Sequence, residues 1–281
     1  SVRPEQFIGI HFFSPVERML LVEIIKGKET GDRAVAKALD YVRQIRKTPI
    51  VVNDARFFYC NRCIIPYMNE AMRIVTEGTP AAMVDHAAQQ LGFPVGPIQL
   101  TDETSVDLGA KIARATKAAM GDAYPESPSD DLIFWMEELG RLGRKSKAGF
   151  FDYDEKGKRQ GYWQGITEKY PAAEELPDIQ DVKDRLMFAQ VLEAVRALEE
   201  GVVEDIREGD VGAILAWGFA PWTGGPYSWL DMLGAEYAAQ RCDELEAAYG
   251  ERFKCPDLLR DMAAKGQSFY GRFDPEAKSA A

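Results

Sequence analysis

The sequence predicts a mainly α-helical protein that begins with part of an α/β domain and continues with two copies of one helical domain. Three observations predict this fold class. The first 53 residues combine short apolar runs with one helical pattern, and the chain from Phe57 onward has helical periodicity. The pattern of the first helical region then returns after residue 181, which is the signature of an internal repeat.

The first 53 residues supply three strands and one helix. Strands are expected over 8–13, 20–26 and 48–52, and a helix with Asp32 as a candidate N-cap is expected over 31–46. One helix cannot cover both faces of a sheet. Residues 1–53 are therefore either a small unusual domain or, as we favour, the C-terminal remnant of a nucleotide-binding domain whose front is not in the chain. No glycine-rich G-x-G-x-x-G turn precedes these strands.

Two helical domains follow. Helices expected over 61–75, 80–91, 98–120 and 130–140 place the first helical domain at 54–154. Residues 155–180 are charged and polar and contain two prolines, so a linker is expected there. A long helix over 182–200 opens the second helical domain, which is expected over 181–281.

The second helical domain repeats the first in order. The matching positions are Glu70 and Glu193, Arg73 and Arg196, Glu77 and Glu200, Asp85 and Asp210, Gly96-Pro97 and Gly225-Pro226, and Asp102 and Asp231. Two unrelated amphipathic helices could share the first matches by chance, but chance would not add the ordered glycine, proline and aspartate matches. The sequence therefore predicts two copies of one all-helical domain.

Composition and charge exclude several classes of function. The net charge of −11 argues against nucleic acid and anionic membrane surfaces as partners, and no apolar run has the length of a membrane span. A polyanionic ligand such as a coenzyme A thioester would need a local basic patch. The four cysteines show no disulfide framework, so a reducing interior and a cytoplasmic location are expected.

His11 and Glu23 are the best candidates for a catalytic pair. Glu23 lies within the apolar run LLVEII, where a buried carboxylate is costly unless it is paired. His11, one of only two histidines, lies on the neighbouring predicted strand. A carboxylate that binds one ring nitrogen fixes the tautomer, so the other nitrogen can take a proton from a substrate hydroxyl. A satisfied core histidine beside an edge-strand glutamate is the simpler alternative, and the residues alone leave both open.

Other motifs favour structural roles. Cys60 and Cys63 spell C-x-x-C, but no second cysteine or histidine pair stands at ligand spacing, so no metal site is predicted. His86 is expected on a helix surface or partly buried. The aromatic stretch 217–231 is expected to serve packing. The basic residues of 141–147 could contact phosphates, but a solvated loop is the better interpretation.

Several separated motifs resemble the 3-hydroxyacyl-CoA dehydrogenase family. Residues 9–27 (GIHFFSPVERMLLVEIIKG) resemble its pattern G-x-H-F-F-N-P-V followed by V-E-I/V-I, and residues 48–62 (TPIVVNDARFFYCNR) resemble T-P-x-V-V-N-D and F-x-x-N-R. The segments EAMRIVTEG, GFPVGPIQLTD and GRKSKAGFFDYD match as well. The resemblance covers nearly the whole chain. It is closest to the dehydrogenase part of multifunctional fatty-acid β-oxidation enzymes, alpha-subunit type, in which a hydratase/isomerase domain comes first.

The resemblance implies the tail of a Rossmann-type NAD-binding domain followed by two dehydrogenase C-terminal domains. It implies that His11 accepts the proton of the 3-hydroxyl of a (3S)-3-hydroxyacyl-CoA, that Glu23 is its partner carboxylate and that Asn61 helps to hold the substrate. NAD is the implied cofactor, but its binding residues are expected upstream of residue 1, so the isolated chain is expected to be inactive. A thiolase subunit is a candidate partner.

Two positions depart from the family pattern. Ser14 stands where the family has asparagine, and Phe57 stands where it has glycine. If that glycine has a positive φ, Phe57 is strained or the backbone has shifted, which bears on the path into Asn61.

Single-copy members of the family dimerise through the helical domain, so the second copy is expected to imitate that partner within one chain. The alternative function is a non-catalytic helical module that docks a hydratase or thiolase. Another NAD-dependent hydroxyacid dehydrogenase with a helical C-terminal domain is a weaker alternative, because it would lack the H-F-F-x-P and V-E motifs.

Overall fold

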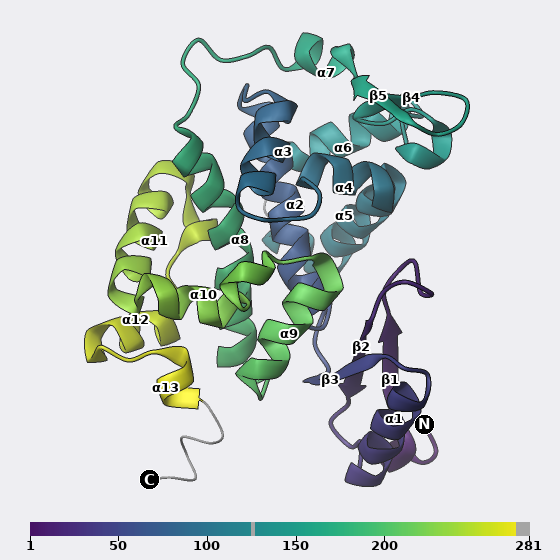
Figure 1. The fold of residues 1–281 in the computed structure, drawn as a ribbon, viewed down its shortest axis with the longest axis vertical. Coiled ribbons are helices and arrows are strands. Elements are labelled where there is room, and N and C mark those ends of the chain that lie inside the picture. Colours follow the sequence, from purple (N-terminus) through teal and green to yellow (C-terminus); the bar gives the residue numbers. More distant parts are fainter. Residues whose placement is uncertain (125–126, 274–281) are drawn as a thin grey trace. The chain divides into compact units, whose positions relative to one another are not determined.

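The chain folds mainly into helices, as the sequence predicts (Figure 1). The computed structural model describes residues 1–124 and 127–273, so residues 274–281 of the second predicted helical domain lie outside the described residues. Two compact units make up the chain. The split unit contains residues 1–65 and the chain from Phe188 onward, and the continuous unit contains residues 66–187. In the part that the structure describes, no helix combines the length and the apolar composition needed to cross a membrane.

The split unit holds a small sheet and the C-terminal helices. Its elements are β1 (Gly9–Phe12), β2 (Leu21–Lys26), α1 (Asp32–Gln44), β3 (Thr48–Asn53), α9 (Ile206–Trp217), α10 (Pro226–Leu233), α11 (Ala235–Tyr249), α12 (Asp257–Lys265) and α13 (Phe269–Phe273). The continuous unit contains α3 (Ala81–Gln90), α4 (Pro97–Thr104), α5 (Val106–Met120), α6 (Pro128–Glu138), β4 (Phe151–Tyr153), β5 (Arg159–Tyr162) and α7 (Gln164–Lys169). Two long helices, α2 (Cys60–Thr76) and α8 (Ile179–Glu199), contribute to both units.

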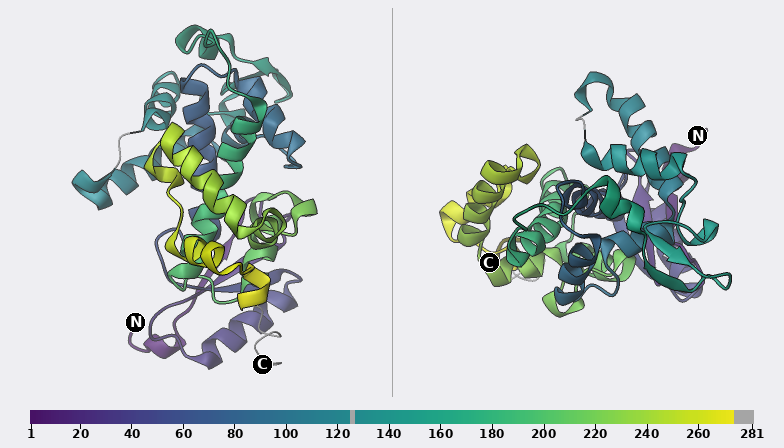
Figure 2. Two further views of the ribbon diagram at one scale, coloured as in Figure 1. Left: turned by 90° about the vertical axis from the view of Figure 1, so that its left-hand side faces the viewer. Right: turned by 90° about the horizontal axis from the view of Figure 1, so that it is seen from above.

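Strand β2 is the centre of a three-stranded sheet with the order β1-β2-β3. It pairs antiparallel with β1 and parallel with β3. All of its residues except the last are buried, which explains why it reads as a continuous apolar run rather than an alternating one. Helix α1 lies along one face of the sheet (Figures 1 and 2). Its buried residues Ala34, Ala38 and Val42 are spaced four apart, so a single stripe of the helix covers this face.

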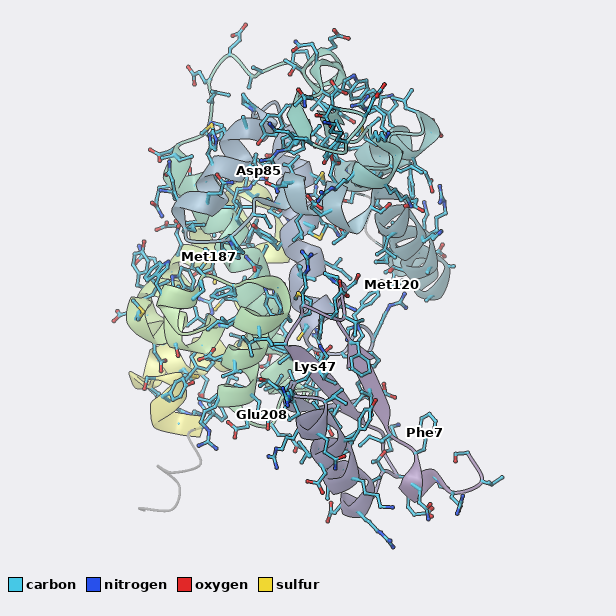
Figure 3. The ribbon with its side chains drawn as sticks, turned by 45° about the vertical axis from the view of Figure 1, so that its right-hand side comes forward. Phe7, Lys47, Asp85, Met120, Met187 and Glu208 are labelled. Carbon is cyan, nitrogen blue, oxygen red and sulfur yellow. The ribbon has the colours of Figure 1, made fainter. Side chains whose placement is uncertain are left out.

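The outer edge of β3 is covered by the chain that leads into α9. Val52 forms an isolated antiparallel bridge with Val203. The Val51 amide donates to the Glu208 carboxylate on α9 at 2.7 Å, and Figure 3 labels Glu208 at this place. Figure 1 shows α9 beside β3. The second predicted helical domain thus pairs a strand edge that would otherwise be open.

Buried aspartates on α3 and α9 hydrogen-bond to the first turn of a later helix, α4 or α10. In the continuous unit, the Asp85 carboxylate accepts from the second and third amides of α4, at 2.8 and 3.2 Å. In the split unit, Asp210 accepts from the second and third amides of α10, at 2.8 and 3.1 Å. Burial raises the pKa of Asp85 to about 6, although its hydrogen bonds act in the opposite direction. Each aspartate fixes the start of a helix whose first amides lack partners within the helix.

Two sequence expectations differ from the structure in detail. Gly31 rather than Asp32 is the N-cap of α1, and Asp32 is its first residue. The interval 155–180, expected as a linker, contains β5 and α7. β5 forms because it pairs with β4. Its sequence is polar and lacks the alternation of apolar and polar residues that would predict a strand.

Arg185 on α8 forms a buried ion pair in the continuous unit. It contacts Glu70 and Glu77 of α2, each at 2.6 Å. The Arg185 and Glu70 side chains are 1% and 2% exposed. Removing one partner of such a pair leaves the other charge buried, and this loss is larger than the net contribution of the pair itself.

Replacing Arg185 with alanine should lower the free energy of unfolding by about 3–5 kcal/mol, because Glu70 loses its closest cation. Arg260→Ala is the matched control. Arg260 pairs with Asp243 at the surface, with side chains 49% and 53% exposed, so its loss should cost at most about 1 kcal/mol. Urea unfolding followed by circular dichroism measures both variants. Similar small losses in the two would contradict the buried pair.

Candidate active site

His11 and Glu23 lie side by side on the adjacent strands β1 and β2. They are register partners in the antiparallel pair of β1 and β2, so their side chains lie on the same face. His11 Nδ1 and Glu23 Oε2 are 2.7 Å apart. The Glu23 side chain is fully buried, while 26% of the His11 side chain is exposed. The structure therefore brings together the two residues that the sequence singles out.

The second oxygen of Glu23 holds the start of α2. Glu23 Oε1 accepts from the backbone amides of Tyr59, at 3.1 Å, and Cys60, at 2.9 Å. Cys60 is the first residue of α2, so the carboxylate lies at the positive end of the helix, where unpaired amides favour an anion. Hydrogen bonds on both oxygens offset the burial of this charge. Sequence reasoning missed these two amides, because a backbone donor carries no residue signature.

These contacts determine which nitrogen of His11 is basic. A carboxylate can only accept a hydrogen bond, so Nδ1 carries the proton that it donates to Glu23. In the neutral ring, Nε2 then has a free lone pair. The ring packs against Phe13 and Phe58, with centroids 4.5 and 5.8 Å away. The site can therefore accept one proton at Nε2 while Glu23 stabilises the resulting positive charge.

The backbone just before α2 is left-handed at two phenylalanines. The angle φ is 65° at Phe57 and 54° at Phe58. Bulky residues rarely adopt this conformation, which costs of order 1–3 kcal/mol for each residue. The sequence comparison with the family pattern predicted strain or a shifted backbone at Phe57. The structure shows the left-handed conformation there and extends it to Phe58, whose ring lies against His11.

Asn61 lies in the first turn of α2, directly after Cys60, and is half-buried. The chain thus carries it to the same helix end that Glu23 binds. Ser14, where the family has asparagine, lies on the exposed connection between β1 and β2.

The remaining motifs of the sequence show no arrangement suited to catalysis in the part of the chain that the structure describes. Cys60 and Cys63 are buried free thiols. Burial raises the pKa of both, and the neighbouring Glu23 raises the pKa of Cys60 further, so both remain protonated at neutral pH. His86 is exposed on α3, and three basic residues of 141–147 are paired with acidic side chains. Within residues 1–124 and 127–273, no group of His, Cys, Asp and Glu could hold a metal ion.

Two family models match the chain. Residues 1–55 match the model for the NAD binding domain of 3-hydroxyacyl-CoA dehydrogenase, and residues 58–153 match the model for the C-terminal domain of the same enzyme. The two matches follow each other in the order of the family and together cover more than half of the chain.

Solved structures share the fold. The crystal structure of 3-hydroxybutyryl-CoA dehydrogenase from Escherichia coli K12 has a TM-score of 0.71 and 22% identity, over 92% of this chain and 70% of that chain. The dehydrogenase part of multifunctional enzyme 1 from C. elegans has a TM-score of 0.67 and 27% identity, over 92% of this chain and 60% of that chain. (S)-3-hydroxybutyryl-CoA dehydrogenase from Ralstonia eutropha has a TM-score of 0.50 and 31% identity, over 55% of each chain.

Glu23→Gln should move the proton of His11 from Nδ1 to Nε2. The glutamine oxygen can keep the backbone amides of Tyr59 and Cys60, which leaves its NH₂ group facing Nδ1. A donor at this place requires an unprotonated Nδ1, so Nε2 takes the proton and loses its basic lone pair. The ¹⁵N chemical shifts of the two ring nitrogens distinguish the tautomers.

Glu17→Gln is the control for this exchange, because Glu17 is exposed on the connection between β1 and β2 and should leave His11 unchanged. His86, the second of the two histidines, provides an internal reference in every spectrum. An unchanged His11 tautomer in a folded Glu23→Gln protein would contradict the hydrogen-bond directions assigned to the pair.

Proposed function

Because the chain belongs to the 3-hydroxyacyl-CoA dehydrogenase family, we propose that it carries the catalytic pair that oxidises a (3S)-3-hydroxyacyl-CoA to a 3-oxoacyl-CoA with NAD⁺. His11 is the base, Glu23 is its orienting carboxylate, and Asn61 helps to hold the substrate at the reacting centre. The observation that carries the proposal is the 2.7 Å contact between His11 and a carboxylate whose other oxygen binds two backbone amides.

The proposed proton transfer follows from this geometry. His11 Nε2 accepts the proton of the substrate 3-hydroxyl, and Glu23 stabilises the imidazolium through the Nδ1 proton. Since Glu23 is fully buried, little water screens its charge, and its effect on the ring is stronger than at a surface. Asn61, in the first turn of α2, has an amide suited to donate a hydrogen bond to a substrate oxygen.

Within residues 1–55, the turn that leads into α1 does not fit the pyrophosphate of NAD, the cofactor of the domain that these residues match. The loop from β2 to α1 is closed on itself and on the N-terminal segment. The Gly27 amide donates to Thr30 Oγ1 at 3.0 Å, the Thr30 hydroxyl to the Phe7 carbonyl at 2.7 Å, and the Gly31 amide to the Glu5 carbonyl at 2.9 Å. These amides are not open to a phosphate, and the sequence contains no G-x-G-x-x-G. In the proposed reaction NAD supplies the hydride acceptor. Because the 281 residues need a further segment to bind NAD, they are expected to be inactive alone.

The proposed context is a multifunctional fatty-acid β-oxidation enzyme with an enoyl-CoA hydratase part. The likeness to the dehydrogenase part of the C. elegans multifunctional enzyme supports this context, although the chain spans only 60% of that protein chain. A cytoplasmic location is consistent with four buried free cysteines. The comparisons do not support a thiolase subunit as partner, and we do not propose one.

The second helical copy is proposed to take the place of a partner subunit. Matching hydrogen bonds support the two copies. Asp85 and Asp210 each bind the second and third amides of the following helix, and Asp102 and Asp231 each bind two consecutive amides of a later aromatic segment. The helices match in length as well, with 8 residues in α4 and α10 and 15 residues in α5 and α11.

Ion pairs between α2 and α8 are exchanged as in a two-fold interface. Arg62 contacts Glu193 and Glu200, at 2.9 and 2.6 Å, and Arg185 contacts Glu70 and Glu77, each at 2.6 Å. Each residue of the second copy follows its match in the first at the same distance along the sequence. In a symmetric dimer each contact also occurs with the two subunits exchanged, and this reciprocity supports a partner role for the second copy.

His11→Ala should lower kcat about 10²–10⁴-fold in the protein that joins this chain to an NAD-binding segment, because it removes the general base. NADH absorbance with 3-hydroxybutyryl-CoA as substrate measures the effect. His86→Ala, at an exposed position on α3, is the control and should keep its activity. If the chain were a non-catalytic assembly module, the two variants would behave alike.

Removing residues 181–281 should make the remaining chain dimerise or precipitate. Helix α2 would lose its ion-pair partners on α8, and β3 would lose the cover of its edge. Size-exclusion chromatography with light scattering, next to the 281-residue chain, gives the oligomeric state. A soluble monomer of residues 1–180 would show that the second copy does not replace a partner.

A further inference from the structure

Tyr59 connects the candidate catalytic pair to the second helical copy. Its backbone amide donates to Glu23 at 3.1 Å, and its side-chain hydroxyl donates to the carbonyl of Gly209, on α9, at 3.1 Å. The side chain is fully buried. Its ring lies edge-on to Trp217, at the end of α9, with centroids 5.9 Å apart. One residue therefore contacts the carboxylate with its backbone and α9 with its side chain.

Two glycines allow α9 to approach this closely. A Cβ atom at Gly209 would lie 2.5 Å from the Tyr227 ring and 3.4 Å from the Tyr59 hydroxyl. A Cβ atom at Gly212 would lie 2.8 Å from Ile50 of β3. Glycine disfavours a helix relative to alanine, so its presence twice in one helix fits a requirement for close packing rather than for helix formation.

The backbone next to Tyr59 requires an anchor. The left-handed conformations of Phe57 and Phe58 persist only where the surrounding structure holds them. Glu23 holds this segment through the amides of Tyr59 and Cys60, and α9 holds it through the Tyr59 hydroxyl. The same amides fix the carboxylate that binds His11, so an anchor for Tyr59 is also an anchor for the pair.

We infer that Tyr59 and the Gly209 carbonyl form a positioning contact, through which the second helical copy keeps Glu23 in place for His11. The expected effect of this contact on catalysis rests on the proposed function, whereas its expected effect on the position of Glu23 does not. Tyr59 acts on Glu23, and Glu23 acts on His11; neither Tyr59 nor Gly209 takes part in the proposed reaction itself. The second copy therefore contributes to the geometry of the active site as well as to assembly.

Tyr59→Phe tests the contact, because it removes the hydroxyl and keeps the ring. Tyr67→Phe is the matched control. The Tyr67 hydroxyl, on α2, is also buried but has no hydrogen-bond partner among the described residues. NMR of the 281-residue chain follows two signals. The exchange rates of the Tyr59 and Cys60 amides report the local backbone, and the proton on His11 Nδ1 reports the pair with Glu23 and would not be moved by a purely structural role.

Tyr59→Phe should raise the exchange rates of both amides about tenfold relative to the rest of the protein and broaden the Nδ1 proton signal. Tyr67→Phe should leave both as in the wild type. Gly209→Ala, whose methyl group would lie 2.5 Å from the Tyr227 ring and so displace the backbone that carries the Gly209 carbonyl, should reproduce the effect of Tyr59→Phe. Unchanged signals in a folded Tyr59→Phe protein would overturn the inference. Failure of Tyr59→Phe to fold, with Tyr67→Phe folded, would also overturn it, since the contact would then serve stability alone.

Activity in the protein that carries an NAD-binding segment separates this inference from the proposed function. There Tyr59→Phe should lower kcat about tenfold with KM unchanged, because the base is present but less well oriented. Retained activity in His11→Ala would refute the proposed function and leave the NMR result intact. An inactive His11→Ala together with a wild-type kcat and wild-type spectra for Tyr59→Phe would refute the positioning role alone.

Discussion

The site depends on the hydrogen bonds of one buried carboxylate. Glu23 lies on the central strand of the sheet, binds His11 on the neighbouring strand with one oxygen, and binds the amides of Tyr59 and Cys60 at the start of α2 with the other. A carboxylate without these partners would be far too costly to bury. The pairing of two strands, the start of a long helix and the tautomer of a histidine are therefore coupled, because disturbing any one of them leaves a bond to the same charge unmade.

The register of the small sheet is the second constraint. His11 and Glu23 meet because they are direct partners in an antiparallel pair. A slip of one residue would turn His11 to the opposite face and break the contact. The apolar residues of β2 fix the register, since Val22 and Ile24 must remain packed on α1. The apolar packing on one face of the sheet thus fixes the positions of His11 and Glu23 on the other face.

Local signals allowed much of this to be predicted from the sequence. The strands stood out as short apolar runs and the helices by their periodicity, and a lone glutamate within LLVEII indicated that a partner was needed. The contacts of Tyr59 could not be predicted, because its amide and its hydroxyl bind residues far away in the sequence and a tyrosine among apolar residues suggests only packing. The same holds for the cover of β3 by α9, which depends on tertiary structure. The departure at Phe57 could be located by its family pattern, whereas the second left-handed residue, Phe58, left no trace in the sequence.

The exchanged ion pairs of α2 and α8 affect how such a chain can evolve. In a homodimer, one substitution changes both symmetry-related contacts at once. In a tandem pair each contact is encoded separately, so a change at Arg62 leaves Arg185 untouched. The two contacts already differ: Arg185 and Glu70 are 1% and 2% exposed, whereas Arg62 and Glu193 are 16% and 18% exposed. In the proposed tandem arrangement, substitutions can therefore accumulate at one of these contacts without altering the other.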